Sequence, residues 1–319
     1  MKNRLLTFFK VAVSLGLLAY VLTRPEILKA DWRGMLASMR LGYWLLALGV
    51  YCVAIGLNVK KWQILIRALG IDAPYPSLFR HNLVGLFFAN LPLSMVGGDI
   101  ARGWDLARTS ASGQAAPVAV SVLLDRLIGL AAFLVAATAG LAYATIALGR
   151  ADLRSLLTIM ASILTGFVVA MAVLMSQRLR ALAERFLGLG PLPRVLPLFR
   201  KLSDSVQVYR NRMSPLLVAL GLGLATVLAT CLVNYLAAMA TGAKVPPEWV
   251  LILTPLTPFA LYIPSIASGL GVNQWVFGLL YHDLAGVMSE PAALAFSLAM
   301  QLIIVASSLP GAVLWWRRR

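Results

Sequence analysis

Long apolar runs without charges constrain the fold of this chain more than any other feature. The longest, residues 249–281, contains 33 residues and no Asp, Glu, Lys or Arg. About 20 mostly apolar residues suffice for a helix that crosses the hydrocarbon core of a bilayer. Hydrophobic residues form 60% of the chain, charged residues 13%, and the mean hydropathy is +0.84. A soluble domain needs a charged surface, so the sequence predicts an all-α polytopic membrane protein.

Six of the runs predict full transmembrane helices. The expected spans are residues 5–23, 41–59, 127–148, 155–177, 213–243 and 291–316. Lys2 and Arg4 precede the first span as in a signal peptide, but Lys10 interrupts the apolar stretch, so we expect this span to be retained. A basic segment, 178–212, carries eight Lys or Arg and predicts interfacial cytoplasmic helices. It separates an N-terminal half, 1–177, from a C-terminal half, 213–319.

Two apolar segments contain Pro and Gly at positions where a continuous helix would not tolerate them. Residues 87–102 and 258–274 repeat Phe, Pro and Gly at the same spacing, in the positions Phe87, Pro92 and Gly97 and the positions Phe259, Pro264 and Gly269. A straight helix over 249–281 would be about 50 Å long, against a hydrocarbon core of about 30 Å. We therefore expect two re-entrant helical hairpins, the first at about 78–107 and the second at about 249–281. Paired interrupted segments in two halves are typical of translocation sites.

The distribution of basic residues predicts the orientation in the membrane. With both hairpins re-entrant, 21 of the 28 Lys and Arg residues fall in 1–10, 60–126, 178–212 and 317–319. The positive-inside rule makes that side, with both termini, cytoplasmic. The hairpins then enter from opposite sides, and the halves are expected to be inverted repeats. This asymmetry explains the net charge of +16, so nucleic acid is not an expected partner.

The first group of candidate site residues follows the break in hairpin one. Gly97 and Gly98 allow a tight turn, Asp99 is expected to cap a new helix, and Arg102 shares its face one turn later. A helix N-terminus beside an arginine can receive a phosphate group. The alternative is that Asp99 only caps the helix and Arg102 anchors it at the interface.

The second group, Asp125 and Arg126, is expected at the mouth of the third span. Adjacent residues on a helix do not face each other, so each needs a partner elsewhere. We predict that Asp125 pairs with Arg102 and Arg126 with Asp99, which would tie hairpin one to this span. A purely structural role is the favoured interpretation of these pairs, because an unpaired charge at membrane depth is costly.

Polar but uncharged residues mark hairpin two. They are Ser265, Ser268, Gly269, Gly271, Asn273 and Gln274. They could line a path for a head group, or satisfy backbone groups freed by Pro264. Other polar residues near or within the spans are interpreted as snorkelling or interhelical contacts; they are Asn58, Lys60, Lys61, Asn234 and Tyr235.

Several chemistries find no support in the sequence. Cys52 and Cys231 lie in apolar runs and are interpreted as buried small residues rather than a disulfide. His81 and His282 lack the spacing of metal ligands, so no metal site is expected. Hydrolase, transferase and nucleotide-binding signatures are missing. We expect a transporter-like protein rather than an enzyme, without a cofactor.

Three motifs resemble the lysylphosphatidylglycerol synthase transmembrane-region family. The first motif contains Asn90, Leu91 and Pro92, followed by Gly97, Gly98, Asp99 and Arg102. The second contains Leu124, Asp125, Arg126 and Gly129. The third contains Pro264, Gly269, Leu270, Gly271 and Val272. This family forms the flippase half of the bacterial multiple peptide resistance factor and also occurs as stand-alone proteins. The resemblance implies translocation of a phospholipid, glycolipid or polyprenyl-linked lipid, with the head group passing between re-entrant elements. It also places Asn90 in the site.

One departure from the family pattern is expected to matter. Relatives have a basic and then an acidic residue where this chain has Asn273 and Gln274, which casts doubt on a mechanism that needs a second carboxylate. No aminoacyl-transferase domain is present in this sequence, so the chain is not expected to make aminoacylated lipid itself.

These observations predict a lipid translocase of a bacterial or archaeal cytoplasmic membrane. Asp99, Arg102, Asp125 and Arg126 would form its polar gate, opposite residues 265–274. A homodimer and a lipid-synthesising enzyme partner are compatible with the sequence. Two alternatives stay open at this point: a non-transporting partner that presents lipid to an envelope glycosyltransferase, and a small-solute channel.

Overall fold

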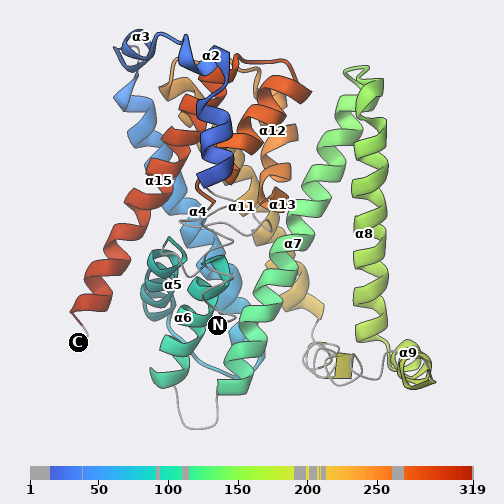
Figure 1. The fold of residues 1–319 in the computed structure, drawn as a ribbon. Helices are drawn as coiled ribbons and strands as arrows, with labels where there is room; N and C mark the ends of the chain where they lie inside the picture. The colour runs from blue at the N-terminus through green and yellow to red at the C-terminus, as the bar shows by residue number, and fades with distance from the viewer. Residues whose placement is uncertain are drawn as a thin grey trace.

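The computed structural model describes residues 15–37, 39–90, 94–109, 115–189, 199–200, 207, 209, 213–260 and 269–317. Helices dominate this part of the chain, as the apolar runs predict (Figure 1). Five are long and apolar enough to cross a membrane. They are α4 (Leu41–Ala68), α7 (Ala115–Ile146), α8 (Arg154–Met175), α11 (Met213–Ala240) and α15 (Glu290–Trp316). Of the first predicted span, residues 15–22 are helical, and 5–14 lie outside the described residues.

Two of these helices extend well beyond the spans predicted for them. α4 continues past Lys60 and Lys61 to Ala68, and α7 begins at Ala115, before Asp125. The sequence interpretation ended each span at its charges, as if they faced the interface, whereas the helices continue through these charges. Lys61 and Asp125 are accommodated inside the protein because they pair with each other. At 32 residues, α7 is about 48 Å long, so it can carry charges and still span about 30 Å of hydrocarbon.

Hairpin one consists of two antiparallel helices, α5 (Tyr75–Ala89) and α6 (Ser94–Thr109). They approach most closely at two glycines, where a Cβ on Gly98 would lie 2.5 Å from the carbonyl oxygen of Gly85. Both helices lie at the end of the molecule where α4 ends and α7 begins (Figure 1). The predicted Pro92 break lies outside the described residues.

The second broken segment is also interrupted. It descends through α12 (Pro247–Leu253), the 3₁₀ turn η2 (Thr254–Leu256) and α13 (Thr257–Ala260), and returns through α14 (Val272–Phe277) and the π-helix η3 (Gly278–Leu284). The two limbs lie side by side, since the Thr254 and Tyr281 hydroxyl oxygens are 3.4 Å apart. Pro255 and Pro258 lack the N–H that a continuous helix would use here. In Figure 1, α12 lies at the opposite end of the molecule from α5 and α6.

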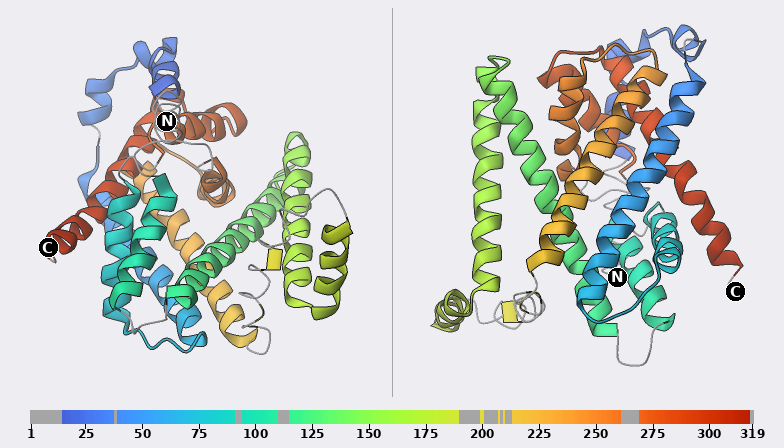
Figure 2. Two further views of the ribbon diagram at one scale, coloured as in Figure 1. Left: turned by 60° about the horizontal axis from the view of Figure 1, so that its bottom comes forward. Right: turned by 180° about the vertical axis from the view of Figure 1, so that it is seen from behind.

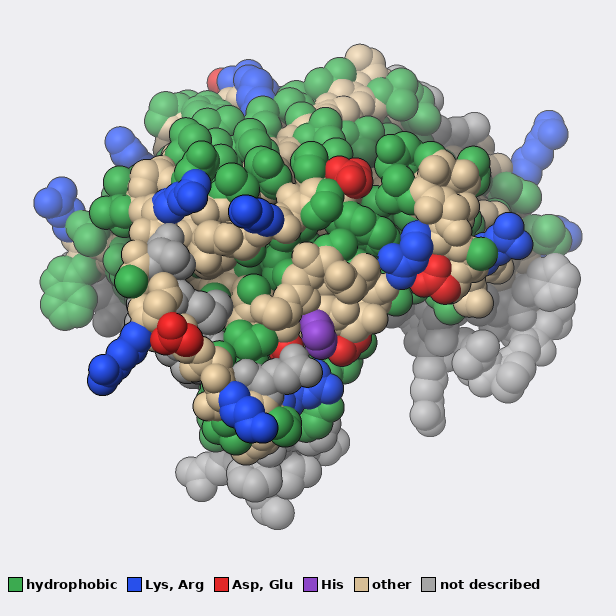
Figure 3. Space-filling model, turned by 90° about the horizontal axis from the view of Figure 1, so that it is seen from above, with side chains coloured by type: hydrophobic (Ala, Val, Ile, Leu, Met, Phe, Trp, Pro, Cys, Tyr) green, Lys and Arg blue, Asp and Glu red, His purple; other side chains and the backbone are tan. Residues whose placement is uncertain are grey.

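The remaining helices form the frame around these two segments. α4 packs along α11, α7 crosses both, and α15 packs against α5 and α14. α8 packs on α7 at the periphery, and α9 (Gln177–Leu189), in the predicted basic segment, lies across its lower end (Figure 2). Viewed from the α12 end, scattered charged side chains lie among broad hydrophobic surfaces (Figure 3). A buried apolar cluster that includes Trp62, Leu78, Leu106 and Val118 joins α4 to hairpin one and the start of α7.

Candidate functional site

Charged side chains from α4, α6 and α7 meet in one buried cluster beside hairpin one. Arg102 of α6 is at its centre, with only 4% of its side chain exposed. Its Nη2 donates to Asp125 Oδ2 of α7 at 2.8 Å, and its Nε donates to Asp99 Oδ1 at 3.0 Å. The guanidinium carbon lies 4.8 Å from the ring centroid of Trp62, whose Nε1 is held by Ser121 Oγ at 3.0 Å. Trp62 therefore supports the planar guanidinium group from α4.

Asp125 has a second cation, Lys61 of α4. The Lys61 Nζ lies 3.1 Å from Asp125 Oδ1 and donates to the main-chain carbonyl of Asp125 at 3.2 Å. Both side chains are almost fully buried. A buried carboxylate is costly unless it is paired and hydrogen-bonded, and Asp125 receives one cation on each oxygen.

Asp99 and Arg126 form the more open edge of the cluster. Arg126 donates from Nη2 to Asp99 Oδ1 at 2.8 Å and from Nε to Oδ2 at 2.5 Å. This is a bidentate pair, the strongest geometry between arginine and a carboxylate. The Arg126 side chain is 49% exposed, against 17% for Asp99. The predicted cross-pairing of Asp125 with Arg102 and of Arg126 with Asp99 is confirmed.

Lys61 is a member of the cluster that the sequence interpretation missed, because it treated this residue as a snorkelling anchor. The sequence feature that could have indicated a partner for Asp125 is Gly129, one turn after Asp125 on α7. A Cβ at Gly129 would lie 3.3 Å from Lys61 Nζ, so the glycine leaves room for the ammonium group. The apolar residues that follow Lys61 also indicate that α4 continues into the protein rather than ending at the interface.

A second polar group, also missed, lies between α5 and α6. His81 was considered only as a metal ligand, but its Nδ1 lies 2.6 Å from Asp105 Oδ2 and its Nε2 lies 3.2 Å from Ser77 Oγ. The neighbouring Asn82 accepts a hydrogen bond from Arg102 Nη1 at 3.5 Å. The histidine group and the charged cluster are therefore in contact through α5.

The structure corrects the predicted turn before Asp99. α6 begins at Ser94, so Gly97 and Gly98 lie within the helix and Asp99 is not its N-cap. The glycines matter for packing instead, because Gly98 allows α6 to approach α5. The proposed anion site at a helix N-terminus beside Asp99 is therefore wrong. Asn90 caps the end of α5, with Nδ2 donating to the Leu86 carbonyl at 3.2 Å.

The candidate residues of hairpin two form a separate group at the start of α14. Gly269 and Gly271 have φ of 95° and 83°, which glycine adopts readily. Gln274 Oε1 accepts from the Gly271 N–H at 2.7 Å, and Asn273 Nδ2 donates to Gln301 Oε1 of α15 at 3.2 Å. These bonds hold the turn and join it to α15. Ser265 and Ser268 lie outside the described residues.

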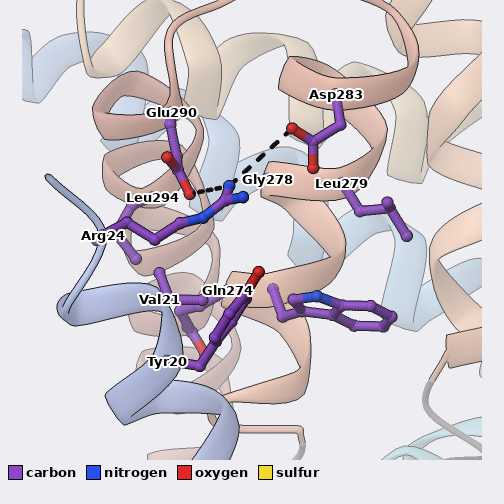
Figure 4. Close-up of a pocket in the computed structure, with 10 residues that line it drawn as sticks. Tyr20, Val21, Arg24, Gln274, Gly278, Leu279, Asp283, Glu290 and Leu294 are labelled. Carbon is purple, nitrogen blue, oxygen red and sulfur yellow. Dashed lines mark hydrogen bonds and ion pairs between the residues drawn. The ribbon is translucent and has the colours of Figure 1, made fainter. Parts of the chain in front are cut away.

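Gln274 also borders a small hollow near the α12 end (Figure 4). There Arg24 lies between two carboxylates, with its Nη1 2.5 Å from Glu290 Oε1 and 4.0 Å from Asp283 Oδ1. Tyr20 and Leu294 complete one wall. The Arg24–Glu290 ion pair connects the chain before α2 (Pro25–Leu28) to the start of α15.

Comparison with protein families adds one finding to this geometry. The family model described as the lysylphosphatidylglycerol synthase TM region matches residues 7–311, nearly the whole chain. Neither the curated proteins nor the solved structures provide a match to this chain.

Proposed function

Because the chain belongs to the lysylphosphatidylglycerol synthase TM-region family, we propose that it moves the polar head group of a lipid between the leaflets of a bacterial or archaeal cytoplasmic membrane. The buried cluster of Lys61, Arg102 and Asp125 carries this proposal. Ionisable side chains within a membrane protein are expensive, so a cluster of them is a functional hypothesis by default. The five apolar helices supply the scaffold that such a path needs.

We propose further that both broken segments are re-entrant. The helices α5 and α6 have 15 and 16 residues, about 22–24 Å each, and are too short to span about 30 Å of hydrocarbon. Their open end lies near the ends of α4 and α7, whereas α12 enters at the opposite end of the molecule (Figure 1). This arrangement supports inverted repeats, in which one half rocks against the other around a central site.

The charged cluster would bind the phosphate of the lipid head group. Arg126 is its exposed member, and the Asp99 carboxylate occupies the position that a phosphate could take between Arg126 and Arg102. Arginine binds carboxylate and phosphate in the same bidentate way, so the two anions can exchange. Asp125 and Lys61 would hold Arg102 in place during this exchange.

The test is Arg102→Ala in proteoliposomes that contain fluorescent phosphatidylglycerol. We expect leaflet exchange of the probe to fall at least about tenfold, since loss of one charge-assisted hydrogen bond costs roughly 1.5–3 kcal/mol. Arg108→Ala is the matched control, because Arg108 lies on the same helix but stacks over Trp104 at 4.4 Å. It should exchange lipid like the wild type.

The two alternatives predict other outcomes in the same vesicles. A protein that only presents lipid to an enzyme would show no exchange even as the wild type. A solute channel would release an entrapped dye without moving the lipid probe. Normal exchange by folded Arg102→Ala protein would remove the charged cluster from the proposal.

A further inference from the structure

The small hollow near the α12 end contains a buried hydrogen-bond donor that lacks an acceptor. Gln274 lines this hollow and is 1% exposed, and its Nε2 makes no hydrogen bond within the described part of the chain. Its Oε1 accepts from the Gly271 N–H at 2.7 Å, and only an oxygen can accept there, so the orientation of the amide is fixed. Because a buried donor without an acceptor is rare and costly, Gln274 points to a guest that accepts a hydrogen bond.

The hollow is small and lies between three elements. Its volume of about 20 Å³ gives room for one group of the size of a water molecule. It lies between the helical residues 15–22, η3 and α15, with Gln274 below Arg24 and with Asp283 facing Arg24 from η3 (Figure 4). η3 is a π-helix, and short π-helical segments frequently occur at functional sites.

The polar atoms around the hollow select the chemistry of the guest. Gln274 Nε2 can only donate, whereas the ionised carboxylates of Asp283 and Glu290 can only accept. An ammonium group has no lone pair for Gln274, and a phosphate oxygen would approach the two carboxylates that flank Arg24. A hydroxyl group can accept from Gln274 and donate to Asp283 at the same time. His282 Nε2 lies 3.9 Å from Asp283 Oδ1, but His282 is not among the lining residues.

The rim of the hollow indicates where such a hydroxyl comes from. Tyr20 and Leu279 line it with apolar surface that is 52% and 39% exposed. In a membrane protein, exposed apolar surface beside a polar hollow suits a molecule with acyl chains and a polar head group. Water also donates and accepts, so the experiment has to distinguish water from a head-group hydroxyl.

We propose that this hollow binds a free hydroxyl group of the lipid head group, so that the substrate is a glycerol-type or sugar-type lipid. This inference rests on the proposed function and names its substrate class. The charged cluster beside hairpin one would bind the phosphate, and the hollow near the α12 end would bind the hydroxyl. Because the two sites lie towards opposite ends of the molecule, a head group would occupy them in succession.

The test compares two anionic lipids that differ only in hydroxyl groups. Phosphatidylglycerol and phosphatidylpropanol share the phosphate and a three-carbon head group, but phosphatidylpropanol has no hydroxyl. Native mass spectrometry of the delipidated protein with an equal mixture of the two measures which lipid is bound. We expect the wild type to prefer phosphatidylglycerol at least about fivefold, the effect of one hydrogen bond in a buried site.

Two variants locate this preference in the hollow. Gln274→Met removes the Nε2 donor at a similar side-chain length, and Asp283→Ala removes an acceptor without touching the bond between Gln274 and Gly271. In both, the preference should fall below about twofold, because the hydroxyl loses one of its two hydrogen bonds. Asp283 is 43% exposed, so its variant also covers the case in which Gln274→Met does not fold. Gln177→Met is the matched control, since Gln177 begins α9, away from the hollow, and it should keep the wild-type preference.

Three results would overturn the proposal. Equal binding of the two lipids by the wild type would mean that the hollow holds water only. A preference that survives in both variants would locate the hydroxyl selectivity elsewhere in the protein. Displacement of phosphatidylglycerol by soluble glycerol phosphate in excess would make a free polyol, rather than a lipid, the ligand.

Probe exchange in proteoliposomes separates this inference from the proposed function. Wild-type protein that exchanges both lipids at the same rate and binds them equally overturns the hydroxyl site and leaves lipid translocation standing. Wild-type protein that prefers phosphatidylglycerol but exchanges neither lipid overturns translocation and leaves a hydroxyl-selective lipid site.

Discussion

At the scale of single residues, the charged cluster shows why charges near span ends need individual interpretation. Lys60 and Lys61 are adjacent, yet Lys60 donates to Gln63 of its own helix whereas Lys61 reaches Asp125 of α7. Arg102 connects two carboxylates, because its guanidinium group pairs with both Asp99 and Asp125. Removal of one member therefore leaves its partners with less compensating charge rather than simply deleting one contact.

The first prediction concerns Lys61. Lys61→Met keeps the length of the side chain but removes the ammonium group, which leaves Asp125 with Arg102 alone. We expect it to lower the free energy of unfolding by about 1–3 kcal/mol, because a buried charged acceptor loses a partner. Thermal unfolding in detergent, followed by tryptophan fluorescence, measures the change.

The control for Lys61→Met is the double variant Lys61→Met with Asp125→Asn. Asparagine lacks the charge that Lys61 compensates, so adding Lys61→Met to Asp125→Asn should lower the free energy of unfolding by less than Lys61→Met lowers it in the wild type. A single variant as stable as the wild type would show that Lys61 does not stabilise Asp125.

At the scale of elements, hairpin one depends on a close approach of two helices. A Cβ at Gly98 would lie 2.5 Å from the Gly85 carbonyl oxygen and 2.8 Å from the Cβ of Ala89. α15 crosses the same hairpin at Gly311, where a Cβ would collide with the Leu83 carbonyl. Small residues at such crossings are how membrane helices pack, because van der Waals contact is a main source of their association.

The second prediction follows from this contact. Gly98→Ala should destabilise the protein by about 1–3 kcal/mol, as overpacking does, and should displace Arg102 with the rest of α6. Gly166→Ala on α8 is the matched control, since a Cβ there meets nothing within 4 Å. That change should be neutral or stabilising by up to about 1 kcal/mol, because alanine favours the helix.

Both variants are compared by thermal unfolding and by probe exchange. Equal stability of the Gly98 and Gly166 variants would contradict the close packing of α5 on α6.

At the scale of the whole molecule, the two broken segments approach from opposite ends of a frame formed by α4, α7, α11 and α15. α8 lies outside that frame, against α7 (Figure 2). Transport by inverted repeats requires that each segment return to the side from which it enters. A homodimer and a lipid-synthesising enzyme partner stay predictions of the sequence.

The third prediction tests the re-entrant topology with an impermeant maleimide. In a background without Cys52 and Cys231, single cysteines are placed at two exposed positions that flank hairpin one, Asp72 and Ala115. Both should label only from the cytoplasmic side. Cysteines at Lys244 and Ser289, which flank the second broken segment, should label only from the opposite side.

Labelling of the Asp72 and Ala115 positions from different sides would mean that the segment between them crosses the membrane. The inverted-repeat arrangement would then be wrong, although the charged cluster would still exist.

The sequence by itself determined the helical membrane fold, the two interruptions and the pairing of Asp125 with Arg102 and of Asp99 with Arg126. Hydropathy and proline affect the structure locally, so both can be interpreted position by position. Adjacent charges on a helix do not face each other, so each needs a partner on another element. Only the tertiary structure decided that Lys61 and His81 belong to the same polar region, and that Asp99 lies inside α6 rather than at its cap. Those facts depend on which faces of α4, α5 and α6 meet, and that is fixed by packing between helices distant in sequence.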